Sequence, residues 1–305
     1  MLQKQIHMAI SYENEAMNFK IDDIIFIINP NSGRQDSYKI IDSLLQIDAN
    51  SHYFISNTIK EFDLFFSSNI DKYKVVVICG GDGTLNNALK FVAKNSQLVL
   101  AMLPNGSGDG FATEMGFGKD IPTLIEQIRI GDTEAVDLIE VNDGYSCNMI
   151  GIGLDSHIAA AFEGSNARGL KSYIYFTIKS LIKYKPIQAT IQVNGTTFKG
   201  LYQMINIANT RQYGNNAFIA PNAKYNDGWL ELVLVKPLPI YLMPGFIFKL
   251  FSGKLKPSKY IQFIKAKELT VKSNSENYHL DGEYRRMPEE LNISISQQFK
   301  IIKVK

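Results

Sequence analysis

Three glycine-rich loops in the first half of the chain each follow a short run of apolar residues. The runs are continuous rather than alternating, which is typical of strands buried on both faces of a parallel sheet. Helical patterns at Tyr38–Ile47 and Thr84–Ala93 follow the first two loops, and a short strand (Tyr53–Ser56) and helix (Glu61–Phe66) lie between them. Such alternation predicts a parallel sheet covered by helices. The runs and loops are Asp23–Ile28 with Asn29–Gly33, Lys74–Cys79 with Gly80–Thr84, and Leu98–Leu103 with Pro104–Gly110.

The positions of these loops indicate an anion site. The carboxyl ends of parallel strands lie at one edge of the sheet, which is where ligands bind in such folds. Glycines let the backbone approach a ligand, and the helix that follows offers unpaired N–H groups to a phosphate. Each loop alone is equally well explained as a tight turn, whereas three on one edge favour a phosphate site. Neither P-loop nor dinucleotide-binding glycine spacing is present.

The second half of the chain has a different pattern. From about Glu134 the segments alternate as antiparallel strands do, with turn signals such as Asn194-Gly195 between them. Two helical segments, 169–184 and 240–251, interrupt the strands. We therefore expect an N-terminal extension (1–20), an α/β domain (21–131) and an all-β domain that carries two helices (132–305), whose last residues return to the first domain. The predicted strands are Ala135–Val141, Tyr145–Ile152, Ala189–Val193, Leu201–Asn209, Trp229–Val235, Glu268–Lys272 and Asn292–Lys303.

Charge, hydrophobic runs and cysteine count limit the partners, the location and the bonding of this chain. The 32 Lys and Arg against 30 Asp and Glu give a formal charge of +2, so we expect no nucleic-acid partner, and any anion must be met by a local patch. No apolar run of about 18 residues could span a bilayer, and no signal peptide is evident, which makes the cytoplasm the expected location. Cys79 and Cys147 lie in apolar stretches and are predicted to be buried free thiols.

The loops belong to a longer ordered set of motifs that spans residues 29 to 283. The chain resembles the diacylglycerol kinase catalytic family, which includes bacterial lipid kinases and the sphingosine and ceramide kinases. GGDGT alone is less specific, because NAD kinases and phosphofructokinases carry versions of it. The motifs are NPNSG at Asn29–Gly33, GGDGT at Gly80–Thr84, LPNGSG at Leu103–Gly108, GIGLD at Gly151–Asp155, APNA at Ala220–Ala223 with Asp227-Gly228, and HLDGE at His279–Glu283.

The resemblance implies a fold and a nucleotide site. The fold would combine an N-terminal three-layer α/β/α nucleotide-binding domain with a C-terminal antiparallel β-sandwich, and ATP would bind between them. Asp82 would contact the nucleotide through Mg²⁺, whose charge phosphoryl transfer needs. Thr58 competes with Ser56 for one nucleotide position. The residues implied to bind the nucleotide are Asn29, Pro30, Asn31, Ser32, Gly33, Ser56, Gly80, Gly81, Asp82, Gly83, Thr84, Gly106 and Ser107.

Two positions depart from the family pattern. The acidic residue that usually closes the GGDGT motif is Asn87 here, and the Asn-Asp pair that often follows the third loop is Asp109-Gly110. These changes leave the phosphate loops intact and alter the charge available to a metal.

Three carboxylates are candidates for the chemistry. A kinase that acts on a hydroxyl benefits from a carboxylate that accepts its proton. By resemblance Glu283 is the proton acceptor with Asp281 beside it, whereas sphingosine kinases use the position of Asp82. We expect Glu283 and Asp281 to act as base and orienting residue, with Asp82 on the metal side. A plain Asp-Gly turn is the alternative for residues 281–283.

A second Mg²⁺ site, away from the chemistry, is implied by the resemblance at Asn226-Asp227-Gly228-Trp229. Its ligands would be the Asp227 side chain and the backbone carbonyls of Lys224 and Trp229. A plain hairpin turn is the alternative. His157 and His279 form no zinc pattern with the cysteines, so we expect no transition metal.

Substrate contacts are expected from the second domain. By resemblance Asp155 faces the lipid head group, where it would bind a hydroxyl or an ammonium; a strand-end turn is the alternative. Lysines alternate with aromatic residues in 168–185 and border apolar residues in 237–256, which suits transient contact with an anionic membrane, although packing on the β domain explains the pattern nearly as well.

The leading functional hypothesis is an ATP-dependent lipid kinase that phosphorylates diacylglycerol, a sphingoid base or a related lipid. A soluble-substrate kinase similar to NAD kinase is the alternative enzyme. A catalytically silent nucleotide-binding regulator is the alternative from another class, which Asn87 and Asp109-Gly110 favour and the retained Asp82, Asp281 and Glu283 oppose. Oligomeric state has no sequence signature here, and a homodimer is kept as an option.

Overall fold

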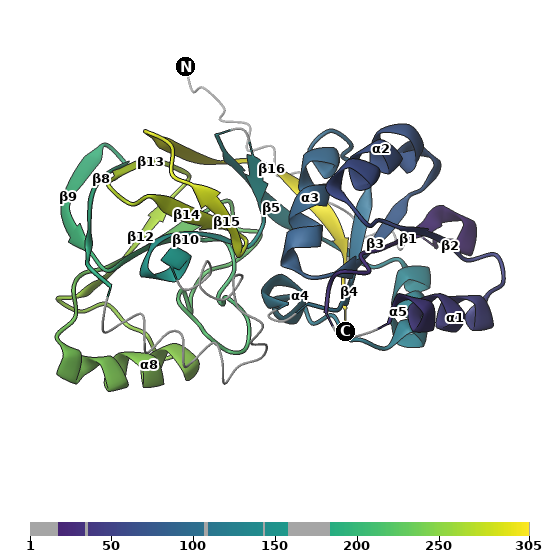
Figure 1. Cartoon of the computed structure of the whole chain (residues 1–305), viewed down its shortest axis with the longest axis horizontal. Helices are drawn as coiled ribbons and strands as arrows, with labels where there is room; N and C mark the ends of the chain where they lie inside the picture. The colour runs from purple at the N-terminus through teal and green to yellow at the C-terminus, as the bar shows by residue number, and fades with distance from the viewer. Residues whose placement is uncertain (1–17, 34–35, 107–108, 143, 158–183, 305) are drawn as a thin grey trace, which may run out of the picture.

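The computed structural model describes residues 18–33, 36–106, 109–142, 144–157 and 184–304. They form two lobes side by side, an α/β lobe built from the first half of the chain and a β lobe built from the second half (Figure 1).

The α/β lobe contains four parallel strands in the order β2-β1-β3-β4. Strands β1 (Ile24–Ile28), β3 (Val75–Gly80) and β4 (Val99–Pro104) are buried along their whole length, as the continuous apolar runs predict. Strand β2 (His52–Ile55) lies at the edge and is partly exposed. All loops that follow these strands therefore emerge at the same edge of the sheet.

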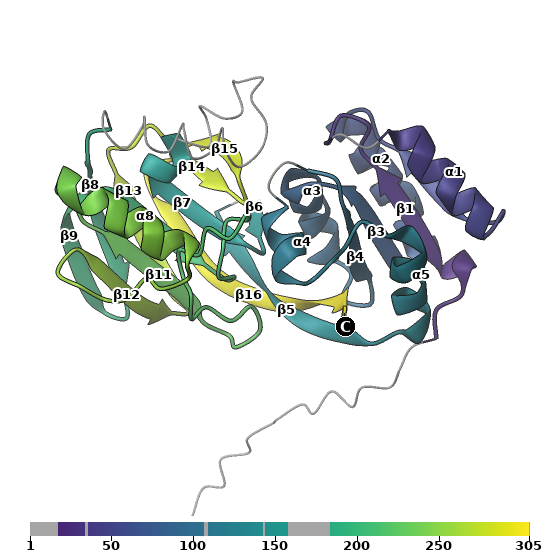
Figure 2. The same cartoon turned by 90° about the horizontal axis from the view of Figure 1, so that it is seen from below.

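Helices cover both faces of this sheet, with α1 and α5 on one side and α2 and α3 on the other (Figures 1 and 2). Side-chain oxygens of Asp36, Thr58 and Asp120 accept hydrogen bonds from backbone N–H groups in the first turns of α1, α2 and α5, which explains where these helices begin. The helices are α1 (Ser37–Ile47), α2 (Ile59–Asn69), α3 (Asp82–Val92), α4 (Gly110–Glu114) and α5 (Ile121–Ile130), with 3₁₀ turns η1 (Ile21–Asp23) and η2 (Ile70–Lys72).

The β lobe is a sandwich of two sheets. A six-stranded antiparallel sheet, in the order β12-β11-β10-β7-β14-β15, faces strands β16, β13, β8 and β9 of the other sheet. Ile150 and Ile205 from the first sheet pack in one core with Ile191 and Leu291 from the second. The six strands are β7 (Met149–Gly153), β10 (Met204–Ala208), β11 (Leu230–Val235), β12 (Ile261–Ala266), β14 (Asn277–Leu280) and β15 (Glu283–Arg286).

Two long strands connect the lobes. Strand β16 (Leu291–Ile302) pairs with β13 near its start, runs antiparallel to β5 (Thr133–Val141), and pairs in parallel with β4 at Lys300 and Ile301. The second sheet of the sandwich is therefore continuous with the sheet of the α/β lobe, and Figure 2 shows β5 and β16 running from one lobe to the other. The remaining strands are β6 (Gly144–Ser146), β8 (Ile187–Val193), β9 (Thr196–Tyr202) and β13 (Glu268–Ser273).

Several elements differ from the sequence expectations. Tyr145–Ile152 is divided into β6 and β7, and Leu201–Asn209 covers the end of β9 and the whole of β10. Strands β12 and β15 and helix α5 were not expected, whereas α4 is the helix expected after the third loop. The predicted helix at 240–251 consists of the 3₁₀ turn η3 (Ile240–Leu242) and α8 (Met243–Phe251), and the one at 169–184 lies almost wholly outside the described residues.

Both cysteines are buried and free, as predicted. Across the described residues, no helix is long and apolar enough to cross a membrane.

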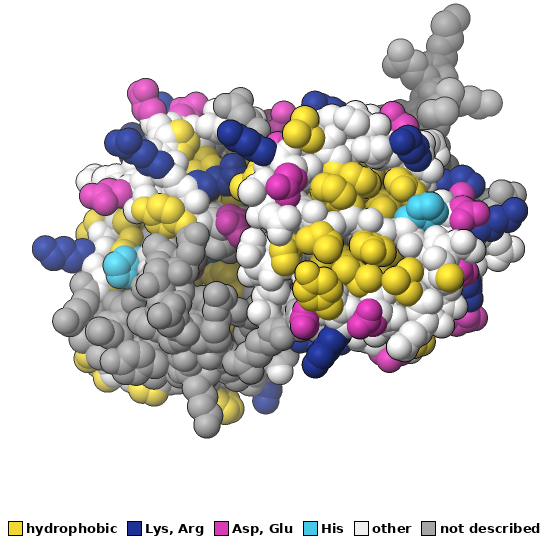
Figure 3. Space-filling view, turned by 45° about the vertical axis from the view of Figure 1, so that its right-hand side comes forward, with side chains coloured by type: hydrophobic (Ala, Val, Ile, Leu, Met, Phe, Trp, Pro, Cys, Tyr) yellow, Lys and Arg dark blue, Asp and Glu magenta, His cyan; other side chains and the backbone are white. Residues whose placement is uncertain are grey.

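Hydrophobic side chains also gather on the surface of the α/β lobe, on the face that comes forward in Figure 3. Exposed large apolar residues of this lobe lie on α1, β2 and α2 and at the end of α5. They are Tyr38, Leu45, Tyr53, Ile59, Leu64 and Ile130.

Candidate active site

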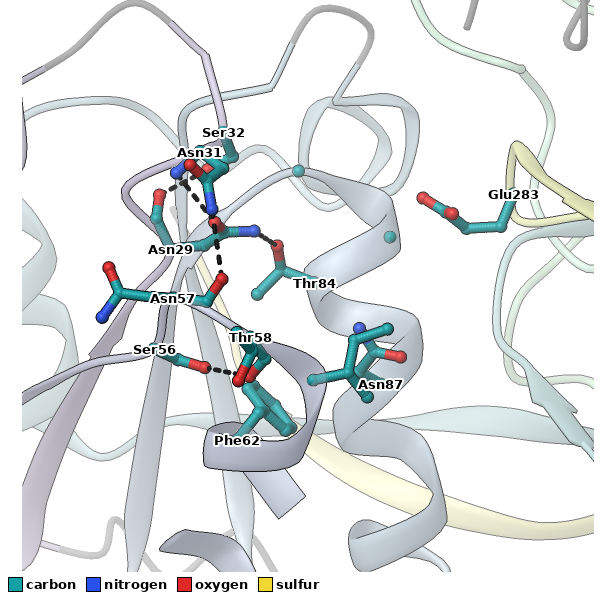
Figure 4. Close-up of a pocket in the computed structure, with 13 residues that line it drawn as sticks. Asn29, Asn31, Ser32, Ser56, Asn57, Thr58, Phe62, Thr84, Asn87 and Glu283 are labelled. Atoms are coloured by element: carbon teal, nitrogen blue, oxygen red, sulfur yellow. Dashed lines mark hydrogen bonds between the residues drawn. The ribbon is translucent and has the colours of Figure 1, made fainter. Parts of the chain in front are cut away.

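A pocket of about 350 Å³ lies where the glycine-rich loops of the α/β lobe face the β lobe (Figure 4). Its volume is within the usual range for small-ligand sites. The lining residues come from the loop after β1, the start of α2, the start of α3 and the start of β15. They are Asn29, Asn31, Ser32, Ser56, Asn57, Thr58, Ile59, Phe62, Gly81, Gly83, Thr84, Asn87 and Glu283.

Hydrogen bonds connect the first loop to its neighbours. The Asn29 side-chain amide donates to Thr84 Oγ1 over 2.9 Å, and the amide of Asn31 donates to the carbonyl oxygen of Asn57 over 3.2 Å (Figure 4). Thr84 lies in the first turn of α3, so the loop after β1 is held against the N-terminus of that helix. This arrangement presents side-chain amides and hydroxyls beside a helix N-terminus, which is suited to binding an anion.

Glycines allow the loops to approach one another closely. Gly33 has a φ of +74°, and a Cβ atom there would overlap the carbonyl oxygen of Asn105 in the third loop. A Cβ on Gly106 would lie 2.8 Å from the Cα of Gly81. Larger residues would force the first and second loops away from the third.

Asp82 is the first residue of α3 and reaches the N-terminus of α4. Its carboxylate accepts hydrogen bonds from the backbone N–H groups of Gly110 (2.8 Å) and Phe111 (3.2 Å), so it caps the N-terminus of α4. Burial raises the pKa of Asp82 to about 7, and the nearby charges of Asp109 and Asp281 act in the same direction.

Asp109 is the second acid of this region. It has a φ of +43°, and its carboxylate accepts a hydrogen bond from the N–H of Gly106 over 2.8 Å. Burial raises its pKa as well. Asp82 and Asp109 therefore bring two carboxylates together behind the second and third loops.

Asp281 is buried, with 4% of its surface exposed. Its carboxylate accepts five hydrogen bonds. The donors are Ser146 Oγ (2.6 Å), the backbone N–H groups of Cys147 (3.2 Å), Asn148 (3.0 Å) and Met149 (3.0 Å), and the side-chain amide of Asn86 on α3 (2.9 Å). These donors occupy the carboxylate within the protein, and Asp281 does not line the pocket.

Glu283 differs from Asp281 in exposure and direction. Asp281 and Gly282 have φ values of +52° and +89° and form the two-residue turn between β14 and β15. Glu283 is the first residue of β15, is exposed, and lines the pocket from the β lobe (Figure 4). Its carboxylate lies over Gly83 in the first turn of α3, where a Cβ atom would overlap it. The Asp-Gly turn and the placement of an acid at the pocket are thus compatible.

Ser56 and Thr58, the two candidates for one nucleotide position, lie between β2 and α2 and both line the pocket. The hydroxyl of Ser56 donates to the carbonyl oxygen of Thr58 over 3.1 Å, and Thr58 is the N-cap of α2. Five other residues that were expected to bind the nucleotide do not line the cavity: Pro30, Gly33, Gly80, Asp82 and Gly106. Ser107 lies outside the described residues.

Four pocket or site residues were not expected from the sequence. Asn57, Ile59 and Phe62 line the cavity beside the N-terminus of α2, and Asn86 contacts Asp281 from α3. The Thr58-x-x-Glu61 spacing is the signal that could have placed the start of α2 at the pocket, because Thr58 caps Glu61 N–H. Nothing in the sequence relates Asn86 to Asp281.

The Asp227 loop has hard oxygen donors of the kind that Mg²⁺ prefers. Asp227 Oδ1 accepts from the N–H of Trp229 (3.1 Å), and Oδ2 lies 2.9 Å from the ammonium of Lys265. A cation bound at Asp227 Oδ2 would therefore have to displace Lys265. In the described part of the chain no group of three or more His, Cys, Asp or Glu residues is arranged to hold a metal. The ligand set of Lys224, Asp227 and Trp229 stays a prediction.

Asp155 is buried at the end of β7, with 4% of its surface exposed. Its carboxylate accepts hydrogen bonds from Ser156 N–H, the Asn206 amide and the Tyr213 hydroxyl, and it lies 3.3 Å from the ring of His279. Its predicted role in binding the lipid head group stays a prediction.

Comparison with known proteins agrees with this geometry. Residues 23–141 match the model of the diacylglycerol kinase catalytic domain, and residues 148–297 match the YegS C-terminal NAD kinase beta sandwich-like domain.

Among curated proteins, the chain is similar to the "Probable lipid kinase YegS-like" of Shewanella frigidimarina. Identity is 31% over 175 residues, and the match covers 55% of this chain and 57% of that protein. It is also similar to "Diacylglycerol kinase" of Bacillus subtilis, at 24% identity over 86% of this chain and 89% of that protein.

A crystal structure described as a diacylglycerol kinase from Bacillus anthracis superposes with a TM-score of 0.70 at 19% identity. The superposition covers 94% of this chain and 98% of that chain. The predicted combination of an N-terminal α/β domain with a C-terminal β-sandwich is confirmed.

Proposed function

Because the chain belongs to the diacylglycerol kinase catalytic-domain family, with a YegS-like sandwich, we propose that it is an ATP-dependent lipid kinase. It would transfer the γ-phosphate of ATP to a hydroxyl group of diacylglycerol, a sphingoid base or a related lipid. The observation that supports this proposal best is the position of Glu283. An exposed carboxylate from the β lobe lies over Gly83, at the pocket formed by the phosphate loops of the other lobe.

ATP would occupy the pocket between the lobes. The side chains of Asn29, Ser32 and Thr84, together with the N-terminus of α3, offer donors to its phosphates. Ile59 and Phe62 supply apolar surface for the base. Mg²⁺ bound with the nucleotide would neutralise phosphate charge. Asp82 and Asp109 do not line the pocket, so they would hold the ion only from behind the loops, in place of the backbone N–H groups that donate to them.

Glu283 is the proposed proton acceptor. As the lipid oxygen forms its bond to the γ-phosphorus, the bond from that phosphorus to the bridging oxygen breaks and ADP leaves. The hydroxyl proton passes to the Glu283 carboxylate. Asp281 serves as a positioning residue, because its five hydrogen bonds fix the turn from which Glu283 extends.

A membrane contact would bring the lipid to this site. Ile240, Tyr241 and Phe248 are 68%, 75% and 67% exposed, and Lys249 and Lys254 are exposed nearby. Apart from Lys254, which follows α8, these residues lie on η3 and α8, and α8 is at the outside of the β lobe (Figure 1). Exposed apolar side chains beside lysines support a transient contact with an anionic bilayer. Of the other predicted membrane segment, only Tyr184 and Lys185 belong to the described residues.

The proposed function is tested by an acceptor panel. The full chain is incubated with γ-labelled ATP and Mg²⁺, with diacylglycerol, sphingosine or ceramide in mixed micelles, or with NAD in solution. The lipid kinase predicts label in the lipid phase for at least one lipid. Label in NAD alone would support the soluble-substrate kinase. ATP binding without transfer to any acceptor would support a silent nucleotide-binding regulator.

A further inference from the structure

A buried polar cluster lies within the six-stranded sheet of the β lobe. Asn206 on β10 and His279 on β14 both pair with Gly151 on β7, so the three residues form a row across neighbouring strands. The carboxylate of Asp155 lies over Gly151, where a Cβ atom would overlap both Asp155 and the His279 ring. Asp155, Asn206 and His279 are 4%, 0% and 3% exposed. Gly151 thus provides the space in which an acid meets a histidine.

The partners of His279 define its tautomer. Its Nδ1 lies 3.3 Å from the backbone nitrogen of Gly282, and its Nε2 lies 3.3 Å from Asp155 Oδ2. A backbone N–H can only donate, so Nδ1 must be unprotonated and accept. The single proton of the neutral ring is then on Nε2, where a carboxylate oxygen accepts it. Both contacts select the same form of the ring.

Gly282 is the second residue of the turn between β14 and β15 and directly precedes Glu283. In a two-residue hairpin the cross-strand pair is Leu280 with Glu283, so the N–H of Gly282 needs a partner outside the ladder. His279 supplies that partner from within the same hairpin. The ring therefore holds the backbone from which the Glu283 side chain extends.

We propose that His279 is a positioning residue for phosphoryl transfer. Its neutral ring, held by Asp155, accepts from Gly282 N–H and fixes the direction of Glu283. This inference rests on the proposed role of Glu283 as proton acceptor. It also gives Asp155 a structural role, which is to orient the His279 ring. Carboxylates that accept a hydrogen bond from the second ring nitrogen orient functional histidines in the same way in other proteins.

Asp155 is itself held by groups from other elements. Ser156 N–H donates to Oδ1, and the Asn206 amide and Tyr213 hydroxyl donate to Oδ2. The backbone carbonyl of Tyr213 also approaches Gly110 of α4, the helix that Asp82 caps. The contact between His279 and Gly282 is therefore part of a chain of contacts that runs from Glu283, through Asp155 and Tyr213, to α4 and Asp82.

Two substitutions distinguish the contribution of Nδ1 from that of Nε2. His279→Asn places an amide oxygen near the position of Nδ1 and keeps an acceptor for Gly282, whereas His279→Gln places an amide N–H near Nε2 and keeps only the donor to Asp155. We expect H279Q to lower kcat for transfer to the lipid by ~10-fold or more, since small misplacements of catalytic groups are costly. H279N should recover most of that loss. The KM for ATP should not change in either, because His279 does not line the pocket.

The outcomes that overturn the proposal are specific. Equal kcat values for H279Q and wild type, or losses in both variants that follow their loss of thermal stability, would leave His279 as a structural residue only. His52→Gln, at a partly exposed histidine of the other lobe, is the matched control.

A second measurement does not depend on activity. In wild-type protein labelled with ¹⁵N-histidine, with the H279N spectrum used for assignment, the His279 ring should be neutral and protonated at Nε2. Protonation at Nδ1, alone or together with Nε2, would overturn the proposal even if no lipid is phosphorylated. Absence of transfer by wild type to every lipid, with the Nε2–H tautomer observed, would count against the proposed function alone.

Discussion

The environments of the three candidate carboxylates separate their roles. Asp281 is buried and accepts five hydrogen bonds. Asp82, the first residue of α3, caps the N-terminus of α4. Glu283 is exposed at the pocket, beside the N-terminus of α3. A proton acceptor must reach the substrate, and this geometric requirement favours Glu283 among the three.

Gly83 is predicted to be essential for the position of Glu283. A methyl group at residue 83 would overlap the Glu283 carboxylate, so Gly83→Ala should lower kcat for transfer by ~10-fold or more. Helix stability should not suffer, because Ala is the better helix former. Steady-state kinetics and thermal unfolding measure the two effects. Gly118→Ala is the control, because a Cβ there meets nothing within 4 Å. Unchanged kcat in G83A would show that Glu283 is not needed at this place.

Asp82 is predicted to make stability depend on pH. Its folded-state pKa of about 7 lies above the ordinary value of 3.8, so the folded protein binds a proton more tightly than the unfolded chain. The stability that protonated Asp82 contributes to the folded protein is fully present below about pH 4 and is lost as pH rises through about 7.

The test compares wild type with Asp82→Asn. Urea denaturation from pH 4.5 to 7.5 should show the variant gaining stability relative to wild type as pH rises. Taking the difference removes the effect of Asp137, whose pKa burial also raises and which does not interact with Asp82. A difference that is constant with pH would contradict the assignment.

At the scale of elements, strands β1, β3 and β4 were predictable because each is a continuous apolar run followed by glycine. Strand β12 was not, because Ile261–Ala266 is partly exposed on both faces and shows neither a continuous run nor a regular alternation. The edges of the pocket could be predicted from the loops, since parallel strands end together. The side of the pocket formed by Ile59 and Phe62 of α2 could not, because it depends on how α2 packs against α3, and local sequence does not encode that packing.

Helix α8 leads to a prediction about membranes. Phe246 and Leu250 are buried, so this side of the helix packs on the β lobe, whereas Phe248 points outward. Replacing Ile240, Tyr241 and Phe248 by Ser should lower co-sedimentation with vesicles of anionic phospholipid by several-fold and leave unfolding nearly unchanged.

The matched control is Leu64→Ser, an equally exposed apolar side chain on α2 of the other lobe. An equal loss of vesicle binding in the α8 variant and in Leu64→Ser, or no binding by wild type, would show that η3 and α8 do not form a membrane contact.

At the scale of the whole molecule, the active site depends on how the two lobes are joined. Asn86 on α3 donates to Asp281 (2.9 Å) and to the carbonyl oxygen of Tyr145 (2.8 Å), and it accepts from Arg285 (3.2 Å). These partners all belong to strands and turns that follow the α/β lobe in the sequence. Together with β5 and β16, they set the lobe that carries Glu283 against the lobe that carries the loops.

Asn86→Ala is therefore predicted to destabilise the protein by about 1–3 kcal/mol, because buried Asp281 loses one of its five donors and the Tyr145 carbonyl loses the Asn86 amide. Chemical denaturation measures the change. Asn87→Ala is the control, since Asn87 lines the pocket and its loss should alter the KM for ATP more than stability. If the two variants unfold alike, Asn86 does not join the lobes in the way described.

These long-range contacts also show where sequence reasoning stops. The donors to Asp281 lie between 132 and 195 residues away in the chain, and neither spacing nor composition relates them. The motif around Asp281 and Glu283 identified both acids as candidates. Only the folded chain separates the buried acid from the exposed one.

The most direct test of the account is γ-phosphate transfer by Glu283→Gln. The acceptor is the lipid that wild type phosphorylates best, and Glu289→Gln, an exposed glutamate in the same lobe, is the control. We predict that E283Q lowers kcat by ~100-fold or more with little change in the KM for ATP, while E289Q behaves as wild type. Turnover by E283Q within a few-fold of wild type would contradict the assignment of Glu283 as the proton acceptor.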